Sequence, residues 1–109
     1  MGSLFIGGVM KIYGQEILVC IGKIPDEFNY DGCYLNDKKQ IILNETLTGD
    51  NLTQVLLHEF IHACIDRLGW RQFMTHEIEE MVCEQLSVAL IENFQVNMIG
   101  NKPKKKKGR

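Results

Sequence analysis

The hydrophobic period of this chain changes once, near residues 48–51. Before that point, apolar residues alternate with polar ones or run in short stretches rich in β-branched side chains, which is typical of strands. After it, apolar residues recur at helical spacing, which is typical of amphipathic helices. This order predicts an α+β domain in which two main helices pack on a small sheet.

The first half of the chain predicts a small antiparallel sheet of about three strands. Residues 4–24 contain one or two of these strands, and residues 16–21 have the clearest strand character. A polar turn at residues 36–39 separates residues 33–35 from a predicted strand at residues 40–43, so these two stretches should pair as a hairpin.

The second half predicts two helices joined by a short connection. The first helix begins at Asp50 or Asn51, either of which can cap it, and ends at Gly69. The second helix is capped by Thr75 and runs to about Phe94.

The first predicted helix contains the sequence His58-Glu59-Phe60-Ile61-His62, an H-E-x-x-H motif. Positions i and i+4 lie on one face of a helix, so both imidazoles can reach a single Zn²⁺. Glu59 lies about 100° further round the helix and can take a proton from a water on that zinc, as the general base of a metallohydrolase does. The motif is flanked by apolar residues, among which polar side chains are costly unless they have partners. A zinc site is therefore favoured over a pair of surface histidines.

A catalytic zinc site needs a third protein ligand, which the second helix can supply. Glu79 lies in the middle of the apolar arc of that helix, where an isolated carboxylate needs a cation. Glu80 points in another direction, beside Glu84. If Glu80 is the ligand, Glu84, one turn later, could orient a zinc-bound histidine. Helical projection leaves both Glu79 and Glu80 open as the third ligand. His76 is a further candidate for the third ligand, and it could instead lie in the metal's surroundings or stabilise an oxyanion, although a surface histidine is the plainer interpretation.

The stretch NLTQVLLHEFIHACIDRLGW, followed by HEIEEMVCEQLSVALIENF, resembles the small HExxH metallopeptidases of the ImmA/IrrE-like and phage-encoded minimal gluzincin type. The resemblance covers roughly residues 31–94 and is specific at the H-E-x-x-H motif. It implies a zincin-like fold and a zinc-dependent peptidase that acts on a peptide or protein. It also implies that an edge strand before the motif helix binds an extended peptide. The glutamate pattern of this family selects Glu80, or Glu79 after a shift of one residue.

The composition excludes several classes of protein. With 45% hydrophobic and 24% charged residues among 109, the chain has the composition of a single globular domain. No apolar run approaches the roughly 18 to 20 residues of a membrane span, and the first residues lack the pattern of a secretory signal. We therefore expect a cytoplasmic protein, with no membrane partner and with its four cysteines reduced.

The basic residues gather at the end of the chain. Residues 102–109 hold six of the 12 Lys and Arg, which leaves six basic and 14 acidic residues in 1–101. An acidic body repels phosphate, so nucleic acid is not expected as a partner except through the tail. We expect one minimal metallopeptidase domain over residues 1–101 and a disordered basic tail over 102–109.

The main alternative to a peptidase is a binding or regulatory module that retains a zinc site without hydrolysis. Glu59 argues against it, because a purely structural site needs no base, whereas a zinc closed off by four protein ligands would favour it. Among the remaining residues, Tyr30 and Tyr34 are expected to pack the hairpin, although either phenol could donate a hydrogen bond near the water. Trp70 is expected to anchor the connection between the helices.

Overall fold

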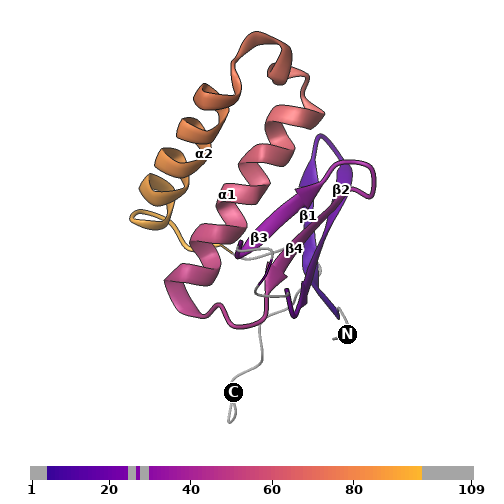
Figure 1. Cartoon of the computed structure of the whole chain (residues 1–109), viewed down its shortest axis with the longest axis vertical. Helices are drawn as coiled ribbons and strands as arrows, with labels where there is room; N and C mark the ends of the chain where they lie inside the picture. Colours follow the sequence, from indigo (N-terminus) through magenta and orange to yellow (C-terminus); the bar gives the residue numbers. More distant parts are fainter. Residues whose placement is uncertain (1–4, 25–26, 28–29, 97–109) are drawn as a thin grey trace.

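The computed structural model describes residues 5–24, 27 and 30–96. Figure 1 shows three layers, with helix α1 between the sheet and helix α2, and the predicted α+β architecture is confirmed. In chain order the elements are β1 (Phe5–Ile12), β2 (Gln15–Gly22), β3 (Gly32–Leu35), β4 (Gln40–Asn44), α1 (Gly49–Arg67), the 3₁₀ helix η2 (Trp70–Phe73) and α2 (His76–Ile91).

The sheet is mixed, with four strands in the order β1-β2-β4-β3. The pairs β1–β2 and β3–β4 are antiparallel, which confirms the predicted hairpin, but β2 and β4 run parallel. The prediction of about three antiparallel strands was therefore wrong in this detail. β3 occupies the outer edge of the sheet, and its hairpin partner β4 lies between β3 and β2. β4 is antiparallel to β3 and parallel to β2.

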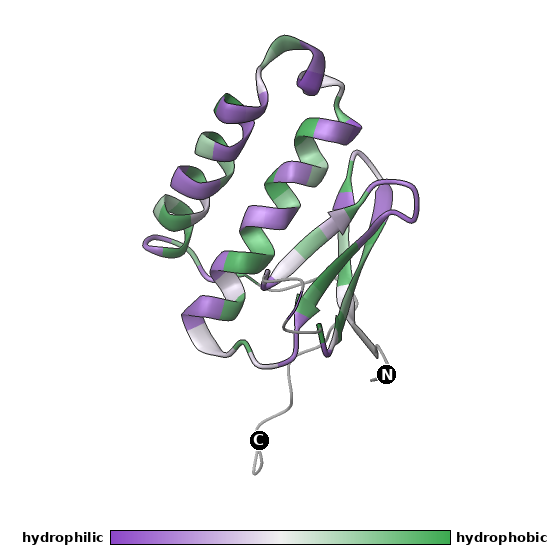
Figure 2. Cartoon of the chain, viewed as in Figure 1, coloured by the Kyte–Doolittle hydropathy of each residue, from purple (hydrophilic) through white to green (hydrophobic). Residues whose placement is uncertain are grey.

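The main core lies between the sheet and α1. Alternate residues of β2 and β4 face the helix, and four of them, Ile17, Val19, Ile41 and Leu43, are at most 1% exposed. A second apolar cluster, between α1 and α2, contains Ile61, Ile65 and Cys83. Figure 2 shows apolar residues along the strands and an alternation of polar and apolar residues along both helices. Helix α1 therefore packs on two sides, which explains why the residues around its H-E-x-x-H motif are so apolar.

The two helices begin differently. Thr75 is the N-cap of α2, as predicted, and its side chain accepts a hydrogen bond from the Ile78 N–H at 3.2 Å. Helix α1 begins after Thr48, which makes no side-chain cap hydrogen bond. The prediction that Asp50 or Asn51 caps α1 was therefore wrong: both residues are already inside the helix, where acidic Asp50 still favours the first turn.

The connection between the helices is not anchored by its tryptophan. The side chain of Trp70 is 51% exposed, so the predicted anchoring role was wrong. Its neighbour Arg71 contacts a carboxylate on each helix instead, Asp66 of α1 and Glu79 of α2. Charged contacts of Arg71, together with the packing of Leu68 and Met74 on the two apolar clusters, therefore hold the connection to the helices.

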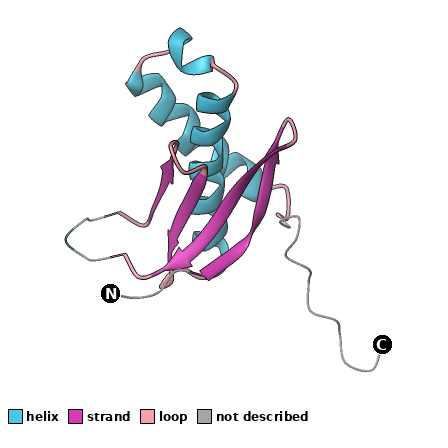
Figure 3. Cartoon of the chain, turned by 90° about the vertical axis from the view of Figure 1, so that its right-hand side faces the viewer, coloured by secondary structure: helices cyan, strands magenta, loops and turns pink. Residues whose placement is uncertain are grey.

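One face of the sheet is covered by α1, and Figure 3 shows the sheet from its opposite side, with the helices behind it. No helix within the described residues is long and apolar enough to cross a bilayer. The basic tail predicted over residues 102–109 lies outside the described residues, as does the predicted end of the folded domain at residue 101.

Candidate metal centre

Three side chains from the two facing helices converge on one point. The H-E-x-x-H motif lies within α1 and brings His58 and His62 to one face, with ring centroids 5.0 Å apart. Opposite them, α2 places the carboxylate of Glu80 at 3.2 Å from His62 Nε2 and 3.7 Å from His58 Nε2. One potential ligand atom from each residue lies within 4.8 Å of the other two. Two imidazole nitrogens and a carboxylate oxygen at this spacing form a possible binding site for a metal ion.

The second nitrogen of each imidazole also faces a carboxylate. Nδ1 of His62 lies 2.6 Å from Glu79 Oε2, and Nδ1 of His58 lies 3.3 Å from Glu84 Oε1. A histidine that binds a metal commonly donates its other N–H to a carboxylate, which fixes the tautomer and the orientation of the ring. Glu84 thus lies where the sequence suggested a carboxylate that orients a histidine. Glu79 lies in the corresponding position beside Nδ1 of His62.

The structure separates the two glutamates that helical projection left open. Glu79 is only 5% exposed, and both of its oxygens accept hydrogen bonds from Arg71, at 3.1 and 3.0 Å. The Arg71 guanidinium holds the pKa of the Glu79 carboxyl below its usual range, against the opposing effect of burial, and the hydrogen bond with His62 lowers it further. The cation that a carboxylate in this apolar arc requires is therefore an arginine. Glu80 is the carboxylate that faces the Nε2 atoms of both histidines.

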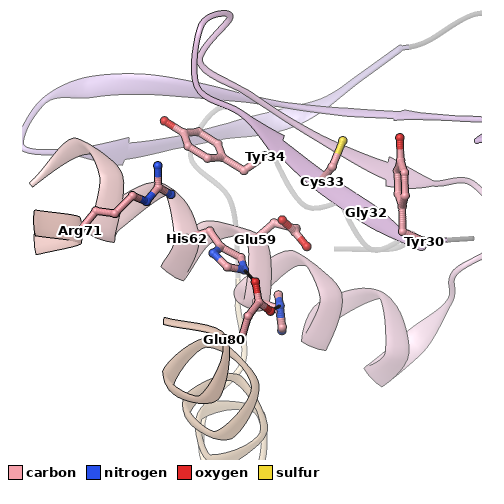
Figure 4. A pocket seen from close by; sticks show the side chains of 9 residues that line it. Tyr30, Gly32, Cys33, Tyr34, Glu59, His62, Arg71 and Glu80 are labelled. Carbon is pink, nitrogen blue, oxygen red and sulfur yellow. Dashed lines mark ion pairs between the residues drawn. The ribbon is translucent and has the colours of Figure 1, made fainter. Parts of the chain in front are cut away.

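Glu59 lies beside these ligand candidates in a cavity of about 360 Å³. Figure 4 shows Glu59, His62 and Glu80 around one opening beneath β3. Burial raises the pKa of the Glu59 carboxyl above its ordinary value, while the two neighbouring histidines oppose this shift. A base with a raised pKa transfers protons more effectively near neutral pH than an ordinary carboxylate. The cavity is lined by Tyr30, Gly32, Cys33, Tyr34, His58, Glu59, His62, Arg71 and Glu80.

Two smaller cavities adjoin this one. One adjoining cavity, of about 280 Å³, shares Arg71 with the first and extends to Met74 and His76. Another, of about 180 Å³, shares Gly32 with it and extends to Gln54. Residues of β3 line two of these three cavities, and because β3 is an edge strand of the sheet, an extended chain could pair with its backbone.

The other polar residues singled out from the sequence have separate positions. Tyr34 donates its hydroxyl to Asp66 at 2.8 Å, so that proton is engaged by a carboxylate outside the group of ligand candidates. Tyr30 lines the cavity and interacts with the thiol of Cys33. His76 is exposed at the start of α2 and lies in the adjoining cavity, outside the group of three ligand candidates.

Arg71 is the main residue of the site that the sequence analysis did not identify. It lies in the short connection before α2, and its one sequence signal is a cation eight positions before a glutamate in an apolar helical arc. Asp66 was also missed, because nothing local distinguishes it from a solvent-exposed acid at a helix end. No family model, curated protein or solved structure matches this chain.

Proposed function

We propose that this protein is a zinc-dependent peptidase whose metal is held by His58, His62 and Glu80. The observation that carries the proposal is the convergence of two Nε2 atoms on one carboxylate, while both Nδ1 atoms face other carboxylates. Two histidines and one glutamate form the ligand set of several catalytic zinc sites, in which a fourth position stays open for water or substrate. Nitrogen and oxygen donors of this kind suit Zn²⁺.

The chain's own residues provide the base for hydrolysis. A bound Zn²⁺ would supply a Lewis acid that polarises a carbonyl group and lowers the pKa of water. Glu59 takes a proton from the attacking water and then passes it to the nitrogen of the leaving amine. Its place in the cavity beside the three ligand candidates supports this role, and its raised pKa suits both transfers.

The expected substrate is a peptide or protein segment in extended conformation. Gly32, Cys33 and Tyr34 of the edge strand β3 line the cavity next to Glu59. A peptide that adds to such an edge gains main-chain hydrogen bonds, which would hold one of its peptide groups over the cavity. The thiols of the chain are free and suit a reducing compartment, in keeping with the proposed cytoplasmic location.

The alternative, a regulatory module with a structural zinc, requires a metal closed off by four protein ligands. The described residues offer a group of three. Glu84 is the nearest further carboxylate to His58, but it faces Nδ1, on the other side of the ring from the atom that faces Glu80. The arrangement therefore favours an open coordination site, and with it the enzyme.

The substitution Glu59→Gln tests the base separately from the metal site. We expect the variant to keep its zinc, measured by elemental analysis after dialysis, because Glu59 is not one of the proposed ligands. Cleavage of a mixed peptide library, followed by mass spectrometry, should fall by about 10²- to 10⁴-fold. Glu77→Gln, which changes an exposed glutamate of α2, is the control and should keep both properties. Hydrolysis that persists in Glu59→Gln would contradict the assigned role.

The substitution His58→Ala tests the metal site itself. It removes one of three proposed ligands, so the zinc content after dialysis should fall well below that of the unchanged protein. His76→Ala is the matched control, because His76 lies outside the group of ligand candidates. An unchanged zinc content in His58→Ala would refute the site.

A further inference from the structure

We propose that Arg71 is a positioning residue of the metal centre, which holds Glu79 on His62 and so reserves Glu80 as the metal ligand. The inference rests on the proposed function, because it concerns how the ligands of that site are selected. It assigns a role to η2, the short connection that carries Arg71.

The contact between Arg71 and Glu79 is bidentate. Nε of Arg71 donates to Glu79 Oε1 at 3.1 Å, and Nη2 donates to Oε2 at 3.0 Å. This paired geometry fixes the plane of a carboxylate as well as its position. The same Oε2 lies 2.6 Å from Nδ1 of His62, so the orientation of Glu79 bears directly on one of the proposed ligands.

The guanidinium of Arg71 is itself held in place from a second direction. Its Nη1 donates to Asp66 Oδ1 at 3.2 Å, and the other oxygen of Asp66 accepts the hydroxyl of Tyr34 at 2.8 Å. The resulting chain of contacts runs from β3 through α1 and η2 to α2. Asp66 therefore holds Arg71 to α1 while Arg71 holds Glu79 of α2.

Glu79 and Glu80 are adjacent on one helix, and both lie next to His62. Without Arg71, Glu79 would be a nearly buried carboxylate that relies on its contact with His62, an arrangement that is costly. Such a carboxylate would gain by turning toward a divalent cation. The bidentate contact with Arg71 removes that gain, because both oxygens are already engaged.

The test compares Arg71→Ala and Arg71→Gln with the control Arg67→Ala. Arg67 lies nearby at the end of α1, where it donates to Gln15 of β2 and also interacts with the phenol of Tyr34. It therefore controls for the loss of a cation at the far end of the same chain of contacts, away from Glu79. Three properties are measured: the visible absorption spectrum of the Co²⁺-loaded protein, the affinity for Zn²⁺ in competition with a chelator, and the thermal unfolding of the metal-free protein.

Both Arg71 variants should show an altered Co²⁺ spectrum, since the orientation of His62 or the identity of the carboxylate ligand changes. Their affinity for Zn²⁺ should fall by about 10- to 100-fold. Arg67→Ala should match the unchanged protein in both properties. The Gln variant keeps a polar side chain of similar length, so it serves if the Ala variant does not fold.

A purely structural role for Arg71 would lower the unfolding temperature of the metal-free protein and leave the Co²⁺ spectrum and the Zn²⁺ affinity at the values of the Arg67 control. That result would overturn the inference while the proposed function stood. Failure of the unchanged protein to bind either Co²⁺ or Zn²⁺ would instead overturn the proposed function, and the inference with it.

Discussion

Tyr34 joins the edge strand of the sheet to the helix that bears the H-E-x-x-H motif. Its hydroxyl donates to Asp66 Oδ2 at 2.8 Å, from β3 to α1. Burial and the adjacent Asp66 carboxylate raise the pKa of Tyr34 from its ordinary value of 10.0 to about 12. The protonated phenol is therefore favoured by the folded state, because only the neutral form can donate to Asp66.

This pKa predicts a loss of stability at alkaline pH. Because the folded pKa of Tyr34 is raised, its contribution to the free energy of unfolding is complete below pH 10 and is lost as the pH rises from 10 to about 12. Tyr34→Phe should remove that loss, measured by urea unfolding at several pH values. It should also remove the late phase of tyrosinate absorbance in the folded protein, the one near pH 12.

Tyr13→Phe is the matched control, because the side chain of Tyr13 is 96% exposed and lies at the turn between β1 and β2. It should leave the late phase of absorbance in place. If the late phase also persists in Tyr34→Phe, the hydrogen bond to Asp66 does not govern the alkaline titration.

The N-termini of the two helices contribute unequally to their stability. Thr75 accepts a hydrogen bond from the N–H of Ile78 and so satisfies one of the unpaired donors of α2. Thr48 has the same side chain at the start of α1 but makes no such bond. The difference matters for the site, because Glu79 and Glu80 follow within the first turns of α2.

Thr75→Ala should therefore lower the free energy of unfolding by about 1 kcal/mol, the usual effect of removing a capping side chain. Thr48→Ala should lower it by clearly less, since no cap hydrogen bond is lost. Both values are measured by urea unfolding of the metal-free protein. Equal losses in the two variants would contradict the assigned cap.

The proposed metal would connect two helices that also meet through a small apolar cluster and through the contacts of Glu79 and Glu84 with the two histidines. Helix α1 supplies His58 and His62, α2 supplies Glu80, and the buried residues of that cluster are Ile61, Ile65 and Cys83. An ion that binds only the folded chain stabilises it in proportion to the logarithm of its concentration. The stability of the packing between α2 and α1 should thus depend on the metal more than the stability of the sheet does.

Adding Zn²⁺ to metal-free protein should raise the free energy of unfolding, by about 2.7 kcal/mol at a free zinc concentration 100 times the dissociation constant. The rise in unfolding temperature should grow with zinc concentration, followed by circular dichroism. His58→Ala is the control, and its unfolding temperature should respond far less. An unfolding temperature of the unchanged protein that is insensitive to zinc would contradict a site formed only in the folded state.

Local features were predictable from the sequence. The pairing of His58 with His62 needs one turn of one helix, and the β3–β4 hairpin needs one short turn, so neighbouring residues contain the information for both. The cap at Thr75 is local in the same sense. For these features, backbone geometry alone determines which side chains meet.

The tertiary structure decided the rest. A strand shows the same alternation whether its neighbour is parallel or antiparallel, so the pairing of β2 with β4 could not be read from residue order. Helical projection places Glu79 and Glu80 about 100° apart around α2, but it does not tell how α2 is rotated against α1. That rotation, together with the position of Arg71 in η2, places Glu79 in a salt bridge with Arg71. It places Glu80 next to both histidines. Contacts between elements distant in the chain depend on packing, which no local pattern encodes.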